Sequence, residues 1–302
     1  MKTNKSAKLT RAWDLYILLI PALILLIVFS YGPLYGLLIA FKDYSVTRGI
    51  WGSKWVGLKH ILRFVESYNF FNLLRNTLTL SLYSLLAGFP IPIILALLIN
   101  KLNFRKYKSF VQTASYAPHF ISTVVLVGML RIFFFPGTGL VNHVMTFFGG
   151  PDFDFFGSAD AFKHLYVLSD VWKTMGWGSI IYIAALSGID PSLYESARCD
   201  GANKFHMLIH IDIPSIVPTI VTLLILNVGS LMNVGYEKAF LMQTPLNTEA
   251  SEIISTYVYK VGLQDAQYSF STAVNVFNSA VNCLLLVAVN RFAKKVGETS
   301  LW

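Results

Sequence analysis

The residues best suited to recognising another protein lie in a polar stretch, residues 187–215, between two apolar segments. Asp190 directly precedes Pro191, an order that favours an aspartate N-cap with proline at the first helical position. Ser192 and Glu195 form an alternative capping box. Either start predicts a short amphipathic helix with few large side chains, a surface suited to insertion into a groove of another protein.

A bend is expected after this first helix. Gly201 permits backbone angles that other residues avoid, and residues 204–210 predict a second helical run that leads to Pro214. His206 and His210 are four positions apart on this run, a spacing that can hold a metal ion. No third ligand accompanies them, so we expect no metal site and assign both histidines to the surface of the loop.

Other polar residues lie inside apolar segments. Four of them are spaced so that they share one face of a helix, namely Ser271, Asn275, Asn278 and Asn282. Two earlier apolar segments contribute Trp172, Lys173, Asn227, Ser230 and Asn233. Amide groups and an aromatic ring match the hydroxyls and the ring face of a sugar, and polar residues in membrane helices usually face a cavity. The alternative is that the amides hydrogen-bond one helix to another.

The sequence lacks the signatures of common catalytic sites. It has no Gly-Lys dipeptide and therefore no phosphate-binding glycine loop, so any ATP must be bound by another chain. It also lacks paired aspartates, a Gly-x-Ser-x-Gly motif and a zinc signature. We expect no catalytic residues in this chain and no enzymatic activity of its own.

A strongly apolar chain must position these residues. Of its 302 residues, 55% are hydrophobic and only 13% are charged, against roughly 25% charged residues in a typical soluble domain. This composition excludes a soluble enzyme, a disordered chain and a collagen-like fibre. Cys199 and Cys283 lie far apart in different kinds of segment, so no disulfide framework is expected.

Several segments are long and apolar enough to cross a bilayer, which takes about 20 residues in a helix. There are six, at residues 15–41, 73–99, 110–135, 165–186, 216–234 and 270–289. In lipid the backbone must satisfy its own hydrogen bonds, so these segments are helices and not strands. Gly88, Pro90 and Pro92 predict a kink in the second segment. We therefore predict an all-α integral membrane protein with six transmembrane helices.

Basic residues indicate the orientation of these helices. With the N-terminus inside, the short inside pieces hold the higher density of basic residues, and residues 100–109 alone contain Lys101, Arg105, Lys106 and Lys108. The positive-inside bias of short loops then places both termini in the cytoplasm. Topology, rather than a nucleic-acid partner, therefore accounts for the net charge of +8.

The loop at residues 187–215 resembles a family motif. It is similar to the E-A-A…G…I-x-L-P loop of permease subunits of binding-protein-dependent ABC importers, with Ser196 for the first alanine and Asp212-Ile213-Pro214 where Leu-Pro is usual. The resemblance assigns coupling to an ATPase to Glu195, Ser196, Ala197, Asp200, Gly201, Ala202 and Pro214. Further similarity from about residue 73 onward points to the carbohydrate branch, the lipoprotein-B-like permeases for complex oligo- and polysaccharides.

The resemblance implies a type I importer permease with the MetI-like fold and two parts. Residues 1–72 would hold an N-terminal cytoplasmic tail, the first transmembrane helix and the first outer loop. Residues 73–302 would form a five-helix transport core, with the cytoplasmic coupling loop at about 187–215. Together, the polar face and the resemblance give a predicted substrate path of Trp172, Asn227, Asn233, Tyr236, Asn275, Asn278 and Asn282.

The resemblance also implies partners. Such permeases pair, usually with a second and different permease, and two copies of a cytoplasmic ATPase subunit bind the ATP and magnesium. An extracellular or periplasmic solute-binding protein delivers the substrate. We therefore expect a multi-pass protein of the bacterial cytoplasmic membrane, in contact with lipid, without a cofactor of its own and without a nucleic-acid partner.

A different class of function remains open, namely a stand-alone secondary transporter or channel for a polar solute. It would need a coupling-ion site, typically an intramembrane carboxylate. The apolar segments contain few acidic residues, and Asp170 lies near the end of one. Transport by this chain alone, driven by an ion gradient without ATP, would favour this alternative.

Overall fold

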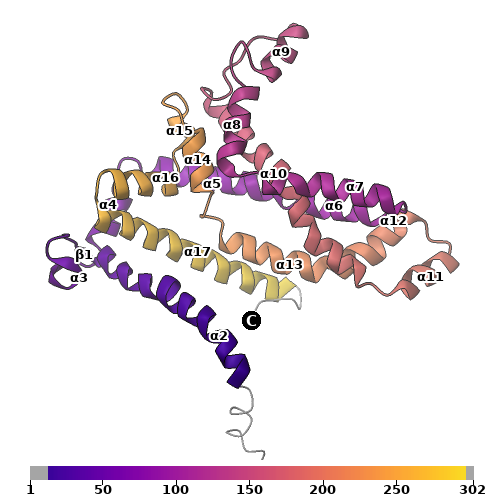
Figure 1. Cartoon of the computed structure of the whole chain (residues 1–302), viewed down its shortest axis with the longest axis horizontal. Helices are drawn as coiled ribbons and strands as arrows, with labels where there is room; N and C mark the ends of the chain where they lie inside the picture. Colours follow the sequence, from indigo (N-terminus) through magenta and orange to yellow (C-terminus); the bar gives the residue numbers. More distant parts are fainter. Residues whose placement is uncertain (1–12, 297–302) are drawn as a thin grey trace, which may run out of the picture. The chain divides into compact units, whose positions relative to one another are not determined.

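The computed structural model describes residues 13–296, which form helices joined by loops and one small two-stranded sheet (Figure 1). The predicted helical class is therefore confirmed. Residues 1–12, part of the predicted cytoplasmic tail, lie outside the described residues. The chain divides into two compact units, one formed by residues up to Glu66 with Val261–Val276, and one by Ser67–Lys260 with the residues from Phe277 onward. The functional division predicted at residue 72 stays a prediction.

The first unit contains a long apolar helix and a small cap, which is formed by residues 42–65. Its elements are α2 (Trp13–Leu26), η1 (Ile27–Tyr31), η2 (Gly32–Phe41), β1 (Lys42–Asp43), α3 (Gly49–Gly52), β2 (Lys54–Trp55), α4 (Lys59–Val65), most of η5 (Lys260–Gln264) and the start of α17 (Tyr268–Val296). β1 pairs antiparallel with β2. Phe64 of α4 is fully buried, and its ring centre lies 6.3 Å from that of Phe270. This contact fixes the cap to the start of α17.

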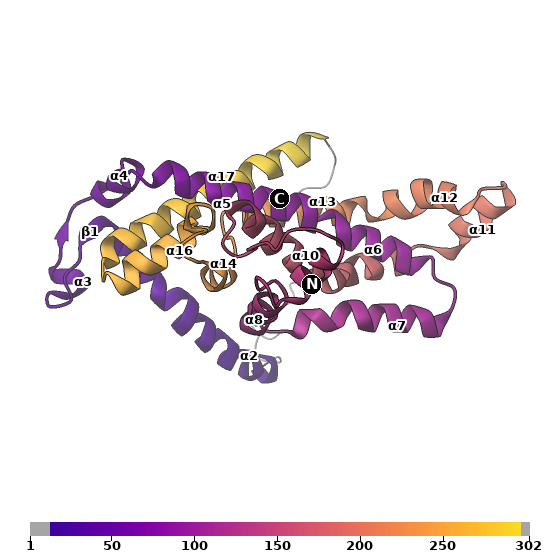
Figure 2. The same cartoon turned by 90° about the horizontal axis from the view of Figure 1, so that it is seen from above.

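The second unit is built around α10. Its elements are α5 (Phe70–Gly88), α6 (Pro90–Asn100), α7 (Arg105–Tyr116), η3 (Ala117–Phe120), α8 (Thr123–Phe133), α9 (Leu140–Phe147), α10 (Ala159–Ser187), α11 (Pro191–Cys199), α12 (Lys204–Met207), η4 (Leu208–Asp212), α13 (Ile213–Gly229), α14 (Tyr236–Met242), α15 (Thr248–Ser251), α16 (Ile254–Tyr259) and the rest of α17. α10 contacts α5, α6, α7, α13, α14 and α15. Figures 1 and 2 both place α11 and α12 at one end of this unit, away from α14 and α16.

Four helices among the described residues are long and apolar enough to cross a membrane, namely Tyr16–Phe41, Phe70–Asn100, Lys204–Gly229 and Tyr268–Lys295. They correspond to the predicted first, second, fifth and sixth segments, although the fifth ends at Gly229 and not at residue 234. The predicted fourth segment lies in α10, which has 29 residues but is more polar, with Asp170 and Lys173 in its middle. The count of six spans and the inside position of both termini stay predictions.

The third predicted segment, residues 110–135, is helical but not continuous, and its role as a membrane span stays a prediction. The helical stretches before and after Ile121 and Ser122 are bent by 98° relative to each other. Pro118 lacks a backbone donor, which weakens the helix at this point. Ser122 has an extended backbone (φ −64°, ψ 154°), and its Oγ accepts a hydrogen bond from Val125 N–H at 3.3 Å. A new, capped helix therefore starts at Thr123.

A buried amide fixes the connection between α14 and α15. Asn247 is fully buried, and its Oδ1 accepts hydrogen bonds from Thr244 N–H at 2.9 Å and from Ser251 Oγ–H at 2.8 Å. Its Nδ2 donates to the backbone oxygens of Phe156 at 2.9 Å and Met242 at 3.0 Å. One side chain thus joins α14, α15 and the segment before α10.

α7 and α10 approach each other closely at Gly176. A Cβ atom on this residue would lie 2.0 Å from the backbone oxygen of Ser115. Gly128 on α8 provides a contrast, because a Cβ there would meet nothing within 4 Å. Glycine at position 176 is therefore required by the backbone-to-backbone contact of two helices.

We expect Gly176→Ala to lower the free energy of unfolding by about 2 kcal/mol, because the added methyl group forces the two helices apart. Gly128→Ala should be neutral or slightly stabilising, since alanine is the better helix former. Thermal unfolding of both purified variants in detergent measures the difference. Equal transition temperatures for the two variants would contradict the close contact.

Candidate functional site

The coupling loop forms the predicted helix, bend and helix. Asp190 is the N-cap of α11, since its Oδ1 accepts a hydrogen bond from Ser192 N–H at 2.9 Å and Pro191 occupies the first helical position. The hydrogen bonds from the Ser192 backbone and side chain hold the pKa of Asp190 below its ordinary value. Of the two predicted starts, the structure adopts Asp190–Pro191 rather than the capping box of Ser192 and Glu195.

Gly201 makes the bend. Its φ of +76° lies in the left-handed region, which favours glycine. The N–H of Ala202 donates to the oxygen of Ala197 at 2.8 Å and closes the end of α11. Asn203 then caps α12, because its Oδ1 accepts a hydrogen bond from Phe205 N–H at 3.0 Å. The predicted bend is therefore confirmed, with a defined cap on each side.

The predicted coupling residues lie on an accessible surface. Ala197 and Ala202 are half-buried, and the exposed members are Glu195, Ser196, Asp200, Gly201 and Pro214. The two alanines line a shallow pocket of about 260 Å³ with His206, Met207, His210 and Ile211. Small side chains beside an open pocket form a surface that another protein can approach closely.

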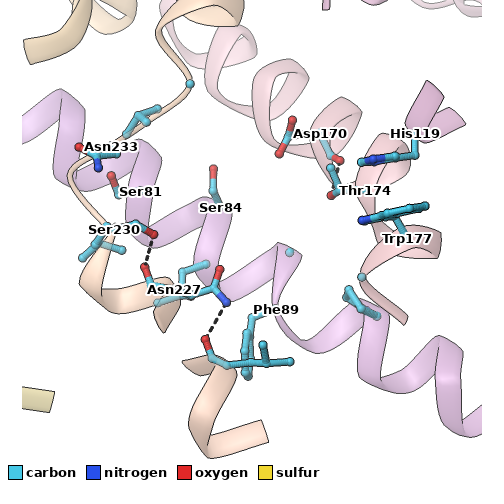
Figure 3. Close-up of a pocket in the computed structure, with 18 of the residues that line it drawn as sticks. Ser81, Ser84, Phe89, His119, Asp170, Thr174, Trp177, Asn227, Ser230 and Asn233 are labelled. Carbon is cyan, nitrogen blue, oxygen red and sulfur yellow. Dashed lines mark hydrogen bonds between the residues drawn. The ribbon is translucent and has the colours of Figure 1, made fainter. Parts of the chain in front are cut away.

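The second candidate site is a pocket of about 460 Å³ among the helices of the second unit, here called the polar pocket. Hydroxyl, amide and carboxylate groups reach its wall from α5, from α10, from the end of α13 and from the loop after α13 (Figure 3). The residues that carry these groups are Ser81, Ser84, Asp170, Thr174, Asn227, Ser230 and Asn233. The predicted kink borders the pocket as well, through Gly88, Phe89 and Pro92.

An aromatic pair forms another wall of the polar pocket. The rings of His119 and Trp177 are stacked, with centres 4.5 Å apart and planes at 3° (Figure 3). Trp177 is 49% exposed, so much of the indole remains free to contact a ligand. A flat ring beside hydroxyl and amide groups suits a ligand that has both hydroxyls and an apolar ring face.

The charges at the polar pocket are paired. Asp170 also borders a smaller neighbouring pocket of about 170 Å³, where Lys238 Nζ lies 3.3 Å from Asp170 Oδ1 and donates to the oxygen of Tyr166 at 2.7 Å. Lys238 is only 4% exposed. Lys173 lines the same smaller pocket, with its Nζ 3.4 Å from Thr123 Oγ1. The carboxylate in the wall is therefore balanced by a buried ammonium group.

The predicted path residues fall into two groups, of which the first centres on Asn233. Asn227 and Asn233 line the polar pocket. Asn278 and Asn282 are buried, and each donates through Nδ2 to Asn233 Oδ1, at 3.2 and 3.1 Å. Asn282 Oδ1 also accepts a hydrogen bond from Met232 N–H at 2.9 Å. Asn278 and Asn282 therefore take the alternative role, in which amides hydrogen-bond one segment to another.

The second group does not line the polar pocket. Trp172 borders a separate apolar pocket of about 550 Å³ between α8 and α10. The ring centre of Tyr236 lies 5.0 Å from that of Tyr259, and Asn275 is exposed on α17. The polar pocket instead uses Trp177 and His119, which the sequence analysis did not single out. A part for Trp172, Tyr236 and Asn275 in the substrate path stays a prediction.

Comparison with known proteins places these sites in context. Residues 69–297 match the family described as "Binding-protein-dependent transport system inner membrane component". Two proteins of Bacillus subtilis (strain 168) are each 43% identical over 98% of this chain. They are the polygalacturonan/rhamnogalacturonan transport system permease protein YteP, covered over 92% of its length, and protein LplB, covered over 93%.

Solved structures are similar along nearly the whole chain. A bacterial ABC transporter involved in the import of the acidic polysaccharide alginate matches with a TM-score of 0.88 and 39% identity, over 96% of this chain and 98% of that chain. A bacterial alginate ABC transporter in complex with an alginate pentasaccharide-bound periplasmic protein matches with a TM-score of 0.89 and 38% identity, over 99% and 100%. The MetNI methionine ABC transporter shares the fold, with a TM-score of 0.52 and 14% identity over 80% of this chain and 97% of that chain.

Proposed function

The chain belongs to the family of binding-protein-dependent transport system inner membrane components, and from this premise we propose that it conducts an oligosaccharide through an ATP-driven importer. The predicted family, the membrane location and the permease role are confirmed by the family match and by relatives that are permeases. The proposal concerns the solute, its path and the partners that drive transport.

The observation that carries the proposal is the composition of the polar pocket. Hydroxyl and amide groups of Ser84, Asn227 and Ser230 line it, and these can exchange hydrogen bonds with sugar hydroxyls. Trp177 is half-exposed and lines the pocket, so its indole offers an apolar surface for the ring of a pyranose. The curated relative YteP is named for polygalacturonan and rhamnogalacturonan, and the similar solved importers are named for alginate, so an oligosaccharide is the solute that fits both lines of support.

The shape of the coupling loop supports the proposal that a separate ATPase supplies the energy for transport. Glu195 and Gly201 lie on an exposed helix–bend–helix with small residues around the bend, which suits a groove of a cytoplasmic ATPase. In this proposal two ATPase subunits bind ATP and magnesium, a second permease completes the passage, and a solute-binding protein delivers the oligosaccharide from outside. The similar solved alginate ABC transporter is in complex with an alginate pentasaccharide-bound periplasmic protein, which supports the proposed binding-protein partner.

The test is uptake into proteoliposomes that contain this chain with its partner permease, its ATPase and its binding protein. Labelled galacturonan and alginate oligosaccharides serve as probes. Uptake that requires ATP and the binding protein supports the proposal. Uptake by this chain alone, driven by an ion gradient, would instead identify a stand-alone secondary transporter.

Two tryptophans of α10 allow a matched test of the path. We expect Trp177→Ala to lower the rate of uptake about tenfold, the effect of losing roughly 1.4 kcal/mol of stacking on a sugar ring. Trp172→Ala, which alters the separate apolar pocket, should change uptake less than threefold. If Trp172→Ala has the larger effect, the path follows the sequence-based assignment and not the polar pocket.

A further inference from the structure

A buried carboxylate joins the coupling loop to two helices of the bundle. Asp212, the last residue of η4, is fully buried. Its Oδ1 accepts a hydrogen bond from Tyr194 Oη–H at 2.5 Å, and its Oδ2 forms an ion pair with Lys101 Nζ. Lys101 Nζ also lies 5.6 Å from the ring centre of Tyr194. Three side chains therefore meet at one point, here called the Asp212 cluster: one from α11, one from the residue directly after α6 and one from the end of η4, directly before α13.

The cluster holds together as a unit because its centre is a buried charge. A carboxylate without access to water needs both a countercharge and hydrogen-bond donors. Lys101 supplies the charge and Tyr194 the donor. Burial and the neighbouring carboxylate raise the pKa of Tyr194, so its hydroxyl stays protonated and remains a donor at physiological pH. The loss of Lys101 leaves Asp212 with an uncompensated buried charge, and the loss of the Tyr194 hydroxyl leaves its Oδ1 without this donor.

The helices on either side of the cluster reach the polar pocket. Pro92 of α6 lines that pocket, and so do Leu223 and Asn227 of α13. α11, by contrast, is flanked by a glycine at each end, Gly188 after α10 and Gly201 before α12. Glycines permit hinge motion, so the chain connections alone would let α11 move independently of the bundle. The Asp212 cluster connects α11 directly to the ends of α6 and η4.

We propose that Asp212 is a positioning residue for energy coupling. Through Tyr194 and Lys101 it makes α11, α6 and α13 move as one body, so that a displacement of the coupling loop reaches the helices that line the polar pocket. This inference rests on the proposed function, because an ATPase partner must supply the displacement. Asp212 itself contacts neither nucleotide nor solute in this scheme.

The experiment measures ATP hydrolysis and uptake together in proteoliposomes with the complete importer. Tyr194→Phe removes only the hydroxyl group and should lower the uptake per ATP hydrolysed about threefold, while Asp212→Asn, which removes the charge, should lower it about tenfold. Hydrolysis should persist in both variants, since the surface that meets the ATPase is unchanged. An unaltered ratio of uptake to hydrolysis in both variants would overturn the proposal.

Matched control variants distinguish a loss of coupling from the general effect of removing a charge and from a failure to fold. Lys101→Met should lower the ratio, whereas Lys106→Met, at an exposed residue of α7, should not. Asp160→Asn, whose carboxylate is 94% exposed at the start of α10, is the control for Asp212→Asn. If Asp212→Asn does not fold, Tyr194→Phe decides the question, because the smaller change leaves the ion pair in place.

A second measurement does not depend on transport. Hydrogen–deuterium exchange of the purified chain in detergent should show α11 exchanging about threefold faster in Tyr194→Phe than in the wild type, because a tether of the helix is lost. Unchanged exchange would count against the cluster even if uptake is altered. If the wild-type importer shows no ATP-driven uptake, the proposed function fails, while the exchange experiment still tests the tether.

Discussion

Gly201→Val should lower ATP-driven uptake in the reconstituted importer at least about tenfold and leave the helix bundle folded. The φ of +76° at this residue lies in the left-handed region, where a β-branched side chain costs about 2 kcal/mol. The bend can relieve that strain only by changing its angles, which displaces α11 relative to α12. A loop of altered shape no longer fits the ATPase, so both stimulated ATP hydrolysis and uptake should fall at least about tenfold, as a misfit of this energy implies.

Gly188→Ala is the matched control, because Gly188 flanks α11 on its other side. Its φ of −85° suits any residue, and an added Cβ would lie at an ordinary 3.4 Å from the oxygen of Ala185. Uptake should stay within about twofold of the wild type, since no strain is introduced. Full activity of Gly201→Val, or equal losses in the two variants, would argue against a role for the bend.

Asn247→Ala should be the most destabilising single change considered for this chain. It removes four hydrogen bonds and leaves the backbone oxygens of Phe156 and Met242 without this donor in a buried place. The loss in free energy of unfolding should be about 4 kcal/mol, given about 1–3 kcal/mol for each buried group left unsatisfied. Thermal unfolding of the purified chain in detergent measures it.

Asn72→Ala on α5 is the control for Asn247→Ala, because the side chain of Asn72 is exposed. Its unfolding temperature should remain close to that of the wild type, as expected for an exposed position. Asn247→Asp provides a graded variant, since it keeps an acceptor for Thr244 and loses the donor to Phe156 and Met242. If alanine at positions 72 and 247 had equal effects, the hydrogen bonds of Asn247 would contribute nothing measurable.

Local features of the coupling loop could be predicted from the sequence because their causes are local. An aspartate followed by proline starts a helix through its own backbone and side chain, and the structure places the N-cap at Asp190. A glycine in a polar stretch marks a bend for the same reason, as Gly201 does. The length of an apolar segment likewise predicts a helix that can cross a membrane without knowledge of its neighbours.

The polar pocket could not be predicted in this way, because its walls come from segments far apart in the chain. Trp172 and Trp177 are five positions apart on α10, which is about 140° around a helix. Only packing against other helices decides which of them faces the polar pocket. The asparagine face of α17 is similar, since its periodicity was evident but its partner, Asn233, lies on another segment. The break at Ser122 had a local signal in Pro118, which the length of the apolar segment concealed.

The contact at Gly176 has a mechanical meaning beyond packing. Because the backbone of Ser115 occupies the space that a side chain would fill, α7 and α10 pack backbone to backbone at this point, and we expect them to move together. η3, which carries His119, follows α7 directly, and Trp177 is the next residue after Gly176. The two stacked rings are thus mounted on a single rigid frame, which should keep its shape through every stage of transport. If the polar pocket is the substrate path, we expect α5 and α13, which also line it, to move when the path opens and closes.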